Sequence, residues 1–123
     1  MRVALIMPAA GPRTGSRTYA GDIATLLATR HDVHRLDPAA LRAPGAGAAL
    51  AARADLLHVL DAKSVLDAVA AVRRAPLPVV IDLHDDYWTG RPPYPAFDRP
   101  ARRLRWRRQR PRYLALLARA DMV

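Results

Sequence analysis

The 123-residue sequence has no cysteine, no glutamate, and a single lysine among its 20 basic residues. The absence of cysteine excludes a disulfide scaffold, a thiolate metal site and a thiol nucleophile. Its apolar runs stay far below the roughly 18 residues of a membrane span. The N-terminal run at residues 3–7 is typical of a buried strand rather than of a signal peptide. We therefore expect a cytoplasmic protein, either free or attached peripherally to the inner face of the membrane.

Positive charge is concentrated in the last fifth of the chain. Residues 1–98 contain 11 basic and 10 acidic residues, for a net charge of +1. Residues 99–123 contain nine basic residues and one aspartate, for a net charge of +8. The isoelectric point of about 11.3 is therefore a property of this final segment.

Short apolar runs alternate along the chain with stretches of helical periodicity. Strands are predicted at residues 3–7, 33–36, 56–60 and 79–83, with the start of a fifth strand at 121–123. Helices are predicted at residues 19–30, at 48–53, from an N-cap at Ser64, and at 101–120 as one helix or as two interrupted at Pro111. This alternation predicts a single α/β domain over residues 1–123. We expect a Rossmann-like three-layer fold, with a parallel sheet of about four strands and helices on both faces.

Binding sites in such folds lie at the carboxyl ends of the strands. The loops that follow Met7, Leu60 and Leu83 are therefore the first places to search for functional residues.

Four short segments, taken in order, resemble the N-terminal domain of GT-B glycosyltransferases of the retaining family 4 type. A strand at residues 2–7 leads into a loop with proline and glycine, and then into a helix. Asp-Leu-Leu-His at residues 55–58 is similar to the Asp-x-x-His strand of that family. Pro-Val-Val-Ile-Asp-Leu-His-Asp at residues 78–85 is similar to its Pro-Val-Val-x-Thr-x-His-Asp. Arg-Ala-Asp at residues 119–121 is similar to the segment that opens the next strand, so the likeness spans nearly the whole chain.

The resemblance implies transfer of a sugar from a nucleotide-sugar donor to an acceptor with retention of configuration. In the family the N-terminal domain contacts the acceptor, whereas a C-terminal domain holds the nucleotide and carries paired glutamates. Because this chain has no glutamate and reaches only the expected fifth strand, we expect a truncated domain that is inactive alone. The expected strand order is third, second, first, fourth. No cofactor is expected, and the acceptor stays open, with lipid-linked and polysaccharide acceptors among the options.

His84 is the strongest catalytic candidate, because it follows an apolar strand at the end that faces the expected cleft. An imidazole there could bond a sugar hydroxyl or help to neutralise phosphate charge. The matching histidine of the family lies near the transferred sugar and the donor phosphates. The alternative is a histidine that only bonds locally at the strand end. Asp85 matches the aspartate of the family and is expected to place the acceptor, whereas Asp86 is interpreted as an insertion.

Further substrate contacts are expected from five residues in the same loops. Asp61 follows the third strand, and the rings of Tyr87 and Trp88 could stack on a sugar face, although packing is the more common role. Gly15 and Ser16 stand where the family has two glycines, which let backbone amides approach a phosphate closely. The Ser16 hydroxyl could instead cap the following helix. The glycine spacing in this loop fits neither a dinucleotide fingerprint nor a P-loop.

The other histidines are assigned no ligand role. His58 lies within a strand and is expected to be structural. His31 and His34 form no metal-ligand set with acids at a useful spacing, so no metal site is predicted.

The arginine cluster between residues 99 and 112 leaves three interpretations open. It is a solvated helix face, an attachment site for an anionic membrane with Trp106 at the interface, or a nucleic-acid contact. The last is the least favoured, because no recognition fold is visible around the cluster. The residues expected to contact an anionic surface are Arg102, Arg103, Arg105, Trp106, Arg107, Arg108 and Arg110.

Two alternatives to the glycosyltransferase hypothesis stay open. One is a non-catalytic basic α/β module that binds an anionic membrane or nucleic acid through residues 99–112. The other is a split enzyme whose nucleotide-binding domain lies on a separate chain.

Overall fold

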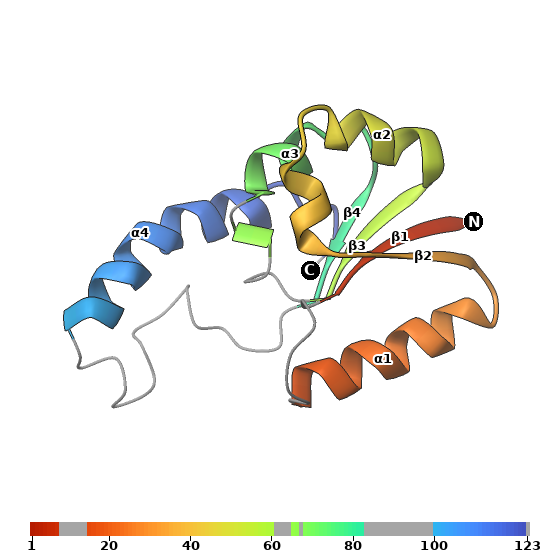
Figure 1. Ribbon diagram of the computed structural model, residues 1–123, viewed down its shortest axis with the longest axis horizontal. Helices are drawn as coiled ribbons and strands as arrows, with labels where there is room; N and C mark the ends of the chain where they lie inside the picture. The colour runs from red at the N-terminus through yellow and green to blue at the C-terminus, as the bar shows by residue number, and fades with distance from the viewer. Residues whose placement is uncertain (8–14, 61–64, 67, 83–99, 123) are drawn as a thin grey trace.

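Strands and helices alternate in the computed structural model, which describes residues 1–7, 15–60, 65–66, 68–82 and 100–122 (Figure 1). The strands are β1 (Arg2–Ile6), β2 (Asp32–Leu36), β3 (Leu56–Val59) and β4 (Val79–Ile81). The helices are α1 (Gly15–Ala28), the 3-10 helix η1 (Pro38–Arg42), α2 (Ala46–Arg53), α3 (Val69–Arg74) and α4 (Pro100–Leu117). All four strands pair in parallel in one sheet, which confirms the predicted α/β class with a parallel sheet of four strands.

The strand order is β2-β1-β3-β4, so the expected order of third, second, first, fourth is wrong. β3 pairs with β1 and not with β2. The burial of the strands explains the difference. Residues 3–6 of β1 are all buried, whereas β2 has no buried residue and suits the edge of a sheet. The apolar β3 therefore completes the free side of β1, where both of its faces can be covered.

The beginning of the predicted fifth strand lies beside β4. Met122 forms an isolated parallel bridge with Val80, and its carbonyl oxygen accepts a hydrogen bond of 3.0 Å from the N–H of Ile81. This placement confirms that residues 121 and 122 extend the sheet at its β4 edge.

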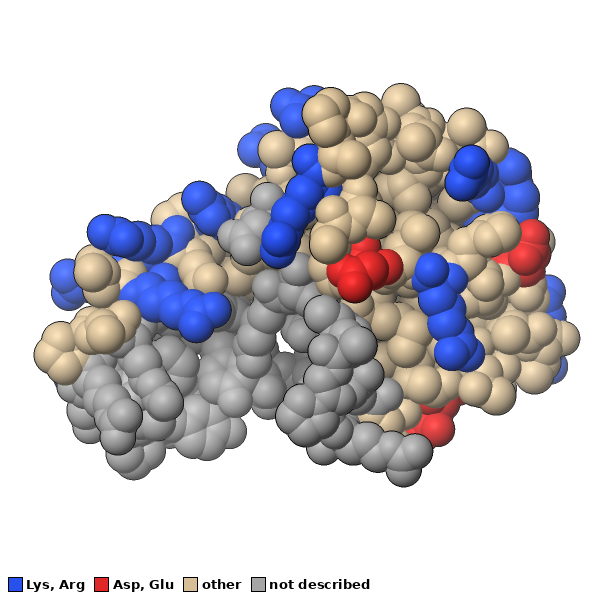
Figure 2. Space-filling model, in the orientation of Figure 1, with Lys and Arg blue, Asp and Glu red and all other residues tan. Residues whose placement is uncertain are grey.

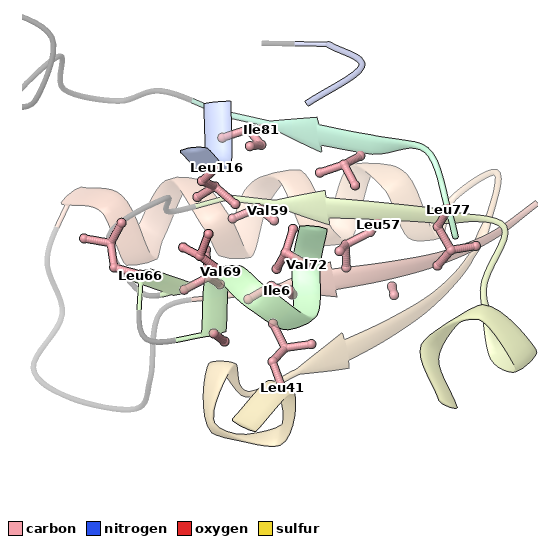
Figure 3. Packing of buried hydrophobic residues seen from close by; sticks show 14 of the residues in the cluster. Ile6, Leu41, Leu57, Val59, Leu66, Val69, Val72, Leu77, Ile81 and Leu116 are labelled. Atoms are coloured by element: carbon pink, nitrogen blue, oxygen red, sulfur yellow. The ribbon is translucent and has the colours of Figure 1, made fainter. Parts of the chain in front are cut away.

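Helices cover both faces of the sheet, as the sequence predicted (Figure 1). Ala20 and Ala24 of α1 pack with Leu5 and Leu60 on one face. The larger cluster lies on the other face, where strand residues meet η1, α3 and α4 (Figure 3). The residues labelled there are Ile6, Leu41, Leu57, Val59, Leu66, Val69, Val72, Leu77, Ile81 and Leu116. Connections that run in opposite directions from the sheet centre place their helices on opposite faces, as right-handed crossovers require.

The helix bounds differ in detail from the sequence prediction, as in α1, which covers residues 15–28 and not 19–30. The regular part of α3 begins at Val69, after the buried Val65 and Leu66, while Ser64 lies outside the described residues. α4 is one continuous helix that contains Pro111. Proline removes the hydrogen bond to the carbonyl four residues earlier, at Arg107. Because both residues are exposed, water can satisfy that carbonyl, and the helix continues.

Gly47 allows α2 to lie directly against α3. A Cβ atom at this position would lie 3.1 Å from the carbonyl oxygen of Ala71 and 3.4 Å from the backbone nitrogen of Ala75. The short α2 is thereby docked by its backbone, which leaves little room for any side chain at residue 47.

Candidate functional site at the carboxyl edge of the sheet

The carboxyl ends of β1, β3 and β4 are level with one another. Ile6 pairs with Val59, and Val59 pairs with Ile81. From β1 the chain proceeds to β2 on one side, whereas from β3 it proceeds to β4 on the other. The connections leave β1 and β3 on opposite sides, and folds of this kind bind ligands beyond the carboxyl ends of the strands that flank such a reversal. The sheet therefore has one topological switch point among its described strands, and it lies between β1 and β3.

The residues that the sequence singled out follow these strand ends in the chain. Gly15 and Ser16 belong to the first turn of α1, where the structure describes the backbone and not the side chains. The other candidates lie outside the described residues, so their roles stay predictions: Asp61, His84, Asp85, Asp86, Tyr87 and Trp88. Leu60 and Asp82, which precede these loops, are described and lie at the carboxyl edge. The N–H of Leu60 bonds the carbonyl of Ile6, and the N–H of Asp82 bonds that of Val59, at 3.0 and 2.9 Å.

His58 and Asp82 form a pair that links β3 to β4. The Nε2 atom of His58 lies 3.2 Å from the Oδ2 atom of Asp82, and only 13% of the His58 side chain is exposed. The contact agrees with the structural role predicted for His58. Sequence reasoning did not single out Asp82. The signal was its position, two residues beyond Val80, the residue that pairs with His58, because residues two apart on a strand share a face.

Asp55 fastens the opposite, amino edge of the sheet. Its Oδ2 atom accepts 2.7 Å from the backbone N–H of Arg2, and its Oδ1 atom accepts 2.7 Å from the Arg2 guanidinium. The Asp55 N–H donates in return to the Arg2 carbonyl at 2.8 Å. These hydrogen bonds from the guanidinium and the backbone N–H of Arg2 hold the pKa of the Asp55 carboxyl below its usual value. Asp55 thus joins β1 to β3 at the edge opposite the carboxyl ends of the strands.

Arg119 and Asp121 fasten the same edge beside β4. The Asp121 carboxylate accepts from the Val79 N–H at 2.8 Å and from the Arg119 guanidinium at 2.9 Å. The backbone bond from Val79, followed by the bond from Arg119, holds the pKa of Asp121 below its usual value. Arg119 also donates to the carbonyls of Ala75 and Leu77, at 3.0 and 2.5 Å. The Arg-Ala-Asp segment therefore holds the turn between α3 and β4.

In the described part of the chain, two hollows lie among the helices η1, α2, α3 and α4. The larger, of about 550 Å³, lies between η1, the start of α2 and α3, and its wall includes Arg42 and Arg74 among small residues. The smaller, of about 430 Å³, lies between α3 and α4 and includes Arg73 and Arg112. Neither includes a described residue of the carboxyl edge.

The arginine cluster lies on α4, which extends past the sheet on the left of the view in Figure 1. Arg103, Arg105, Arg107 and Arg108 are exposed, and Arg110 is half-buried. Arg102 and Trp106 are part of the helix, and their side chains lie outside the description. Blue side chains gather over α4 in Figure 2, with no acidic residue in the helix itself.

Comparison with known proteins gave no match to a family model, to a curated protein or to a solved structure. Across the ranges that the structure describes, no three His, Asp or Glu side chains gather as metal ligands. None of the described helices is both long and apolar enough to cross a bilayer.

Proposed function

We propose that this chain is the acceptor-side domain of a retaining glycosyltransferase of the GT-B type. One observation supports the proposal above the others, namely the level carboxyl ends of β1, β3 and β4 at a topological switch point. In the sequence, the candidate residues Gly15, Asp61 and His84 come after these same three strands. A ligand held there would meet the loops after Met7, Leu60 and Asp82 together.

The roles of the individual residues follow from this position. In the complete enzyme His84 lies beside the sugar and the donor phosphates, Asp85 helps to place the acceptor, and Gly15 borders the cleft. A second domain supplies the donor nucleotide, so the chain by itself binds acceptor without catalysing transfer. His58 anchors Asp82 at 3.2 Å, two residues before His84. That anchor fixes the position of the chain two residues before His84, and positioning of this kind is what oriented catalytic groups require.

Nuclear magnetic resonance of the 15N-labelled chain tests the proposal. The probes are methyl glycosides of glucose, mannose, galactose and N-acetylglucosamine, followed by UDP-glucose and GDP-mannose. We expect at least one probe to shift the amide signals of Met7, Leu60 and Asp82, and to leave those of Arg2 and Asp55 in place. The latter two report on the opposite edge of the sheet.

Two histidine variants make the test specific. His84→Ala is expected to abolish the shifts, whereas His34→Ala, whose imidazole is half exposed on the edge strand β2, is expected to retain them. The proposal is wrong if no probe shifts the carboxyl-edge amides. It is also wrong if His84→Ala and His34→Ala respond alike.

A further inference from the structure

The first three turns of α4 combine dense positive charge with exposure. The helix contains seven arginines and no acidic residue among its 18 residues. Its later part is anchored by the buried Tyr113 and Leu116, whereas residues 103–105 and 107–108 are exposed. The arginine-rich part extends past the sheet, away from β1 and β2 (Figure 1). Such a concentration of positive charge attracts a partner of opposite sign.

The arginines form two rows along the helix. At about 100° of turn per residue, positions three, four or seven apart fall on one side. One row is Arg103, Arg107 and Arg110, and the other is Arg105, Arg108 and Arg112. Their mean directions lie about 165° apart around the axis. Between them, on the side away from the buried Tyr113, runs a strip that contains Leu104 and Pro111.

This arrangement fits a groove with a negative wall on each side better than it fits a flat surface. A helix that lies on a bilayer needs a wide apolar face, and the strip offers a single large apolar side chain, Leu104, which is 51% exposed. The major groove of duplex DNA is about 12 Å wide and admits one α-helix, with phosphates along both edges. A leucine at the centre of the strip can contact thymine methyl groups on the floor of the groove.

We propose that residues 100–112 of α4 bind duplex DNA in its major groove, with one arginine row on each phosphate wall. Each row runs about 10 Å along the helix, which is enough to reach about three phosphates on each strand. The inference goes beyond the proposed sugar-binding site and does not depend on it. It also reverses the order of preference that the sequence suggested, in which an anionic membrane stood before nucleic acid.

Fluorescence anisotropy of the whole chain with a mixed-sequence DNA duplex of about two helical turns provides the test. With about six phosphate contacts, the plot of log affinity against log salt should have a slope of about −5. Affinity should therefore fall about a thousandfold between about 50 and 200 mM salt. A duplex of RNA should bind more weakly, because its major groove is deep and narrow.

A matched pair of triple variants locates the surface. Arg105, Arg107 and Arg108 make no hydrogen bond or ion pair within the described structure, so their replacement by Gln removes charge without removing a contact of the fold. The control replaces Arg30, Arg35 and Arg53 by Gln, which are exposed and lie outside α4. Both variants lower the net charge of +9 by three.

The α4 variant is expected to flatten the slope to about −3 and to weaken binding at least tenfold more than the control. Replacement of the same three arginines by Lys should restore most of the binding. Leu104→Ser should leave the slope of the salt dependence unchanged. It would reduce vesicle binding if α4 were a membrane helix.

Vesicles of phosphatidylcholine, with and without phosphatidylglycerol, form the second arm. The proposal is overturned if the chain binds the anionic vesicles and not DNA, which would make α4 a membrane helix. It is equally overturned if the two triple variants lose DNA affinity to the same extent, because binding would then depend on net charge alone. Thermal melts of each variant confirm that the chain is folded before either result is used.

Discussion

Replacement of Arg119 by Ala probes the contacts that hold the end of α3 against the start of β4. The guanidinium donates to the carbonyl oxygens of Ala75 and Leu77, at 3.0 and 2.5 Å, and to the Asp121 carboxylate at 2.9 Å. The two carbonyls belong to the turn that joins α3 to β4. Alanine leaves both carbonyls without this donor in a region that is partly shielded from water.

The magnitude can be worked out from the two carbonyl contacts. A hydrogen bond from a charged donor contributes about 1.5–3 kcal/mol. The Arg119 side chain is 24% exposed, so water replaces part of each contact, and the lower end of that range applies. We expect Arg119→Ala to lower the free energy of unfolding by about 2–3 kcal/mol, or the melting temperature by about 10 °C. Arg119→Lys keeps the charge but loses the planar fork of the guanidinium. It should therefore lower the free energy of unfolding by about half as much as Arg119→Ala.

Urea denaturation followed by circular dichroism measures the effect, since small single domains usually unfold in one step. Arg53→Ala is the matched control, because Arg53 is exposed and its side chain makes no hydrogen bond or ion pair within the described part of the chain. Its effect should stay within about 0.5 kcal/mol. Equal midpoints for Arg119→Ala and Arg53→Ala would show that Arg119 does not hold the turn between α3 and β4.

Two further predictions concern glycines and carboxylates. Gly47→Ala should lower the melting temperature, because its Cβ would lie 3.1 Å from a carbonyl of α3, whereas Gly21→Ala, with nothing within 4 Å, should raise the stability of α1 by about 0.5–1 kcal/mol. Parallel thermal melts compare the two variants, and a stabilising Gly47→Ala would contradict the close packing of α2 on α3. The pKa values of Asp55 and Asp121 are lowered in the folded state. Their contribution to stability is therefore present above about pH 4 and is lost as the pH falls through the lowered folded pKa values. Urea midpoints measured against pH should fall less steeply in acid for Asp55→Asn and Asp121→Asn than for the wild-type chain; equal acid dependence would contradict these assignments.

The strands could be predicted from local sequence, because β1, β3 and β4 are short apolar runs bounded by turn residues, and β2 contains Val33 and Leu36 just before the Asp37-Pro38 break. Predicted residues 33–36 and 79–83 overlap β2 and β4, and the predicted start of a fifth strand lies at Met122, beside Val80. The strand order could not be predicted in the same way. It depends on which strand covers the free side of β1, and that choice is made by packing between segments far apart in the sequence.

The sequence predicted where the candidate site lies but not how its residues are arranged. The sequence placed it at the carboxyl ends of the strands, and the register of β1, β3 and β4 brings those ends level. The roles of Asp55, Arg119 and Asp121 could not be predicted from their motifs. Their hydrogen bonds reach partners 42 to 53 residues away at the amino edge, so only the folded chain shows them to be structural.

The sequence by itself determined the class of the fold and the concentration of charge, because apolar runs and arginine content are local properties of the chain. It placed seven arginines at residues 102–112, in a segment predicted as one helix or as two, without showing how that segment lies on the domain. Tertiary structure decided which sides of the helix present that charge to solvent. Packing of Tyr113 and Leu116 into the core fixes the rotation of α4, and this rotation leaves the two arginine rows on either side of an outward strip.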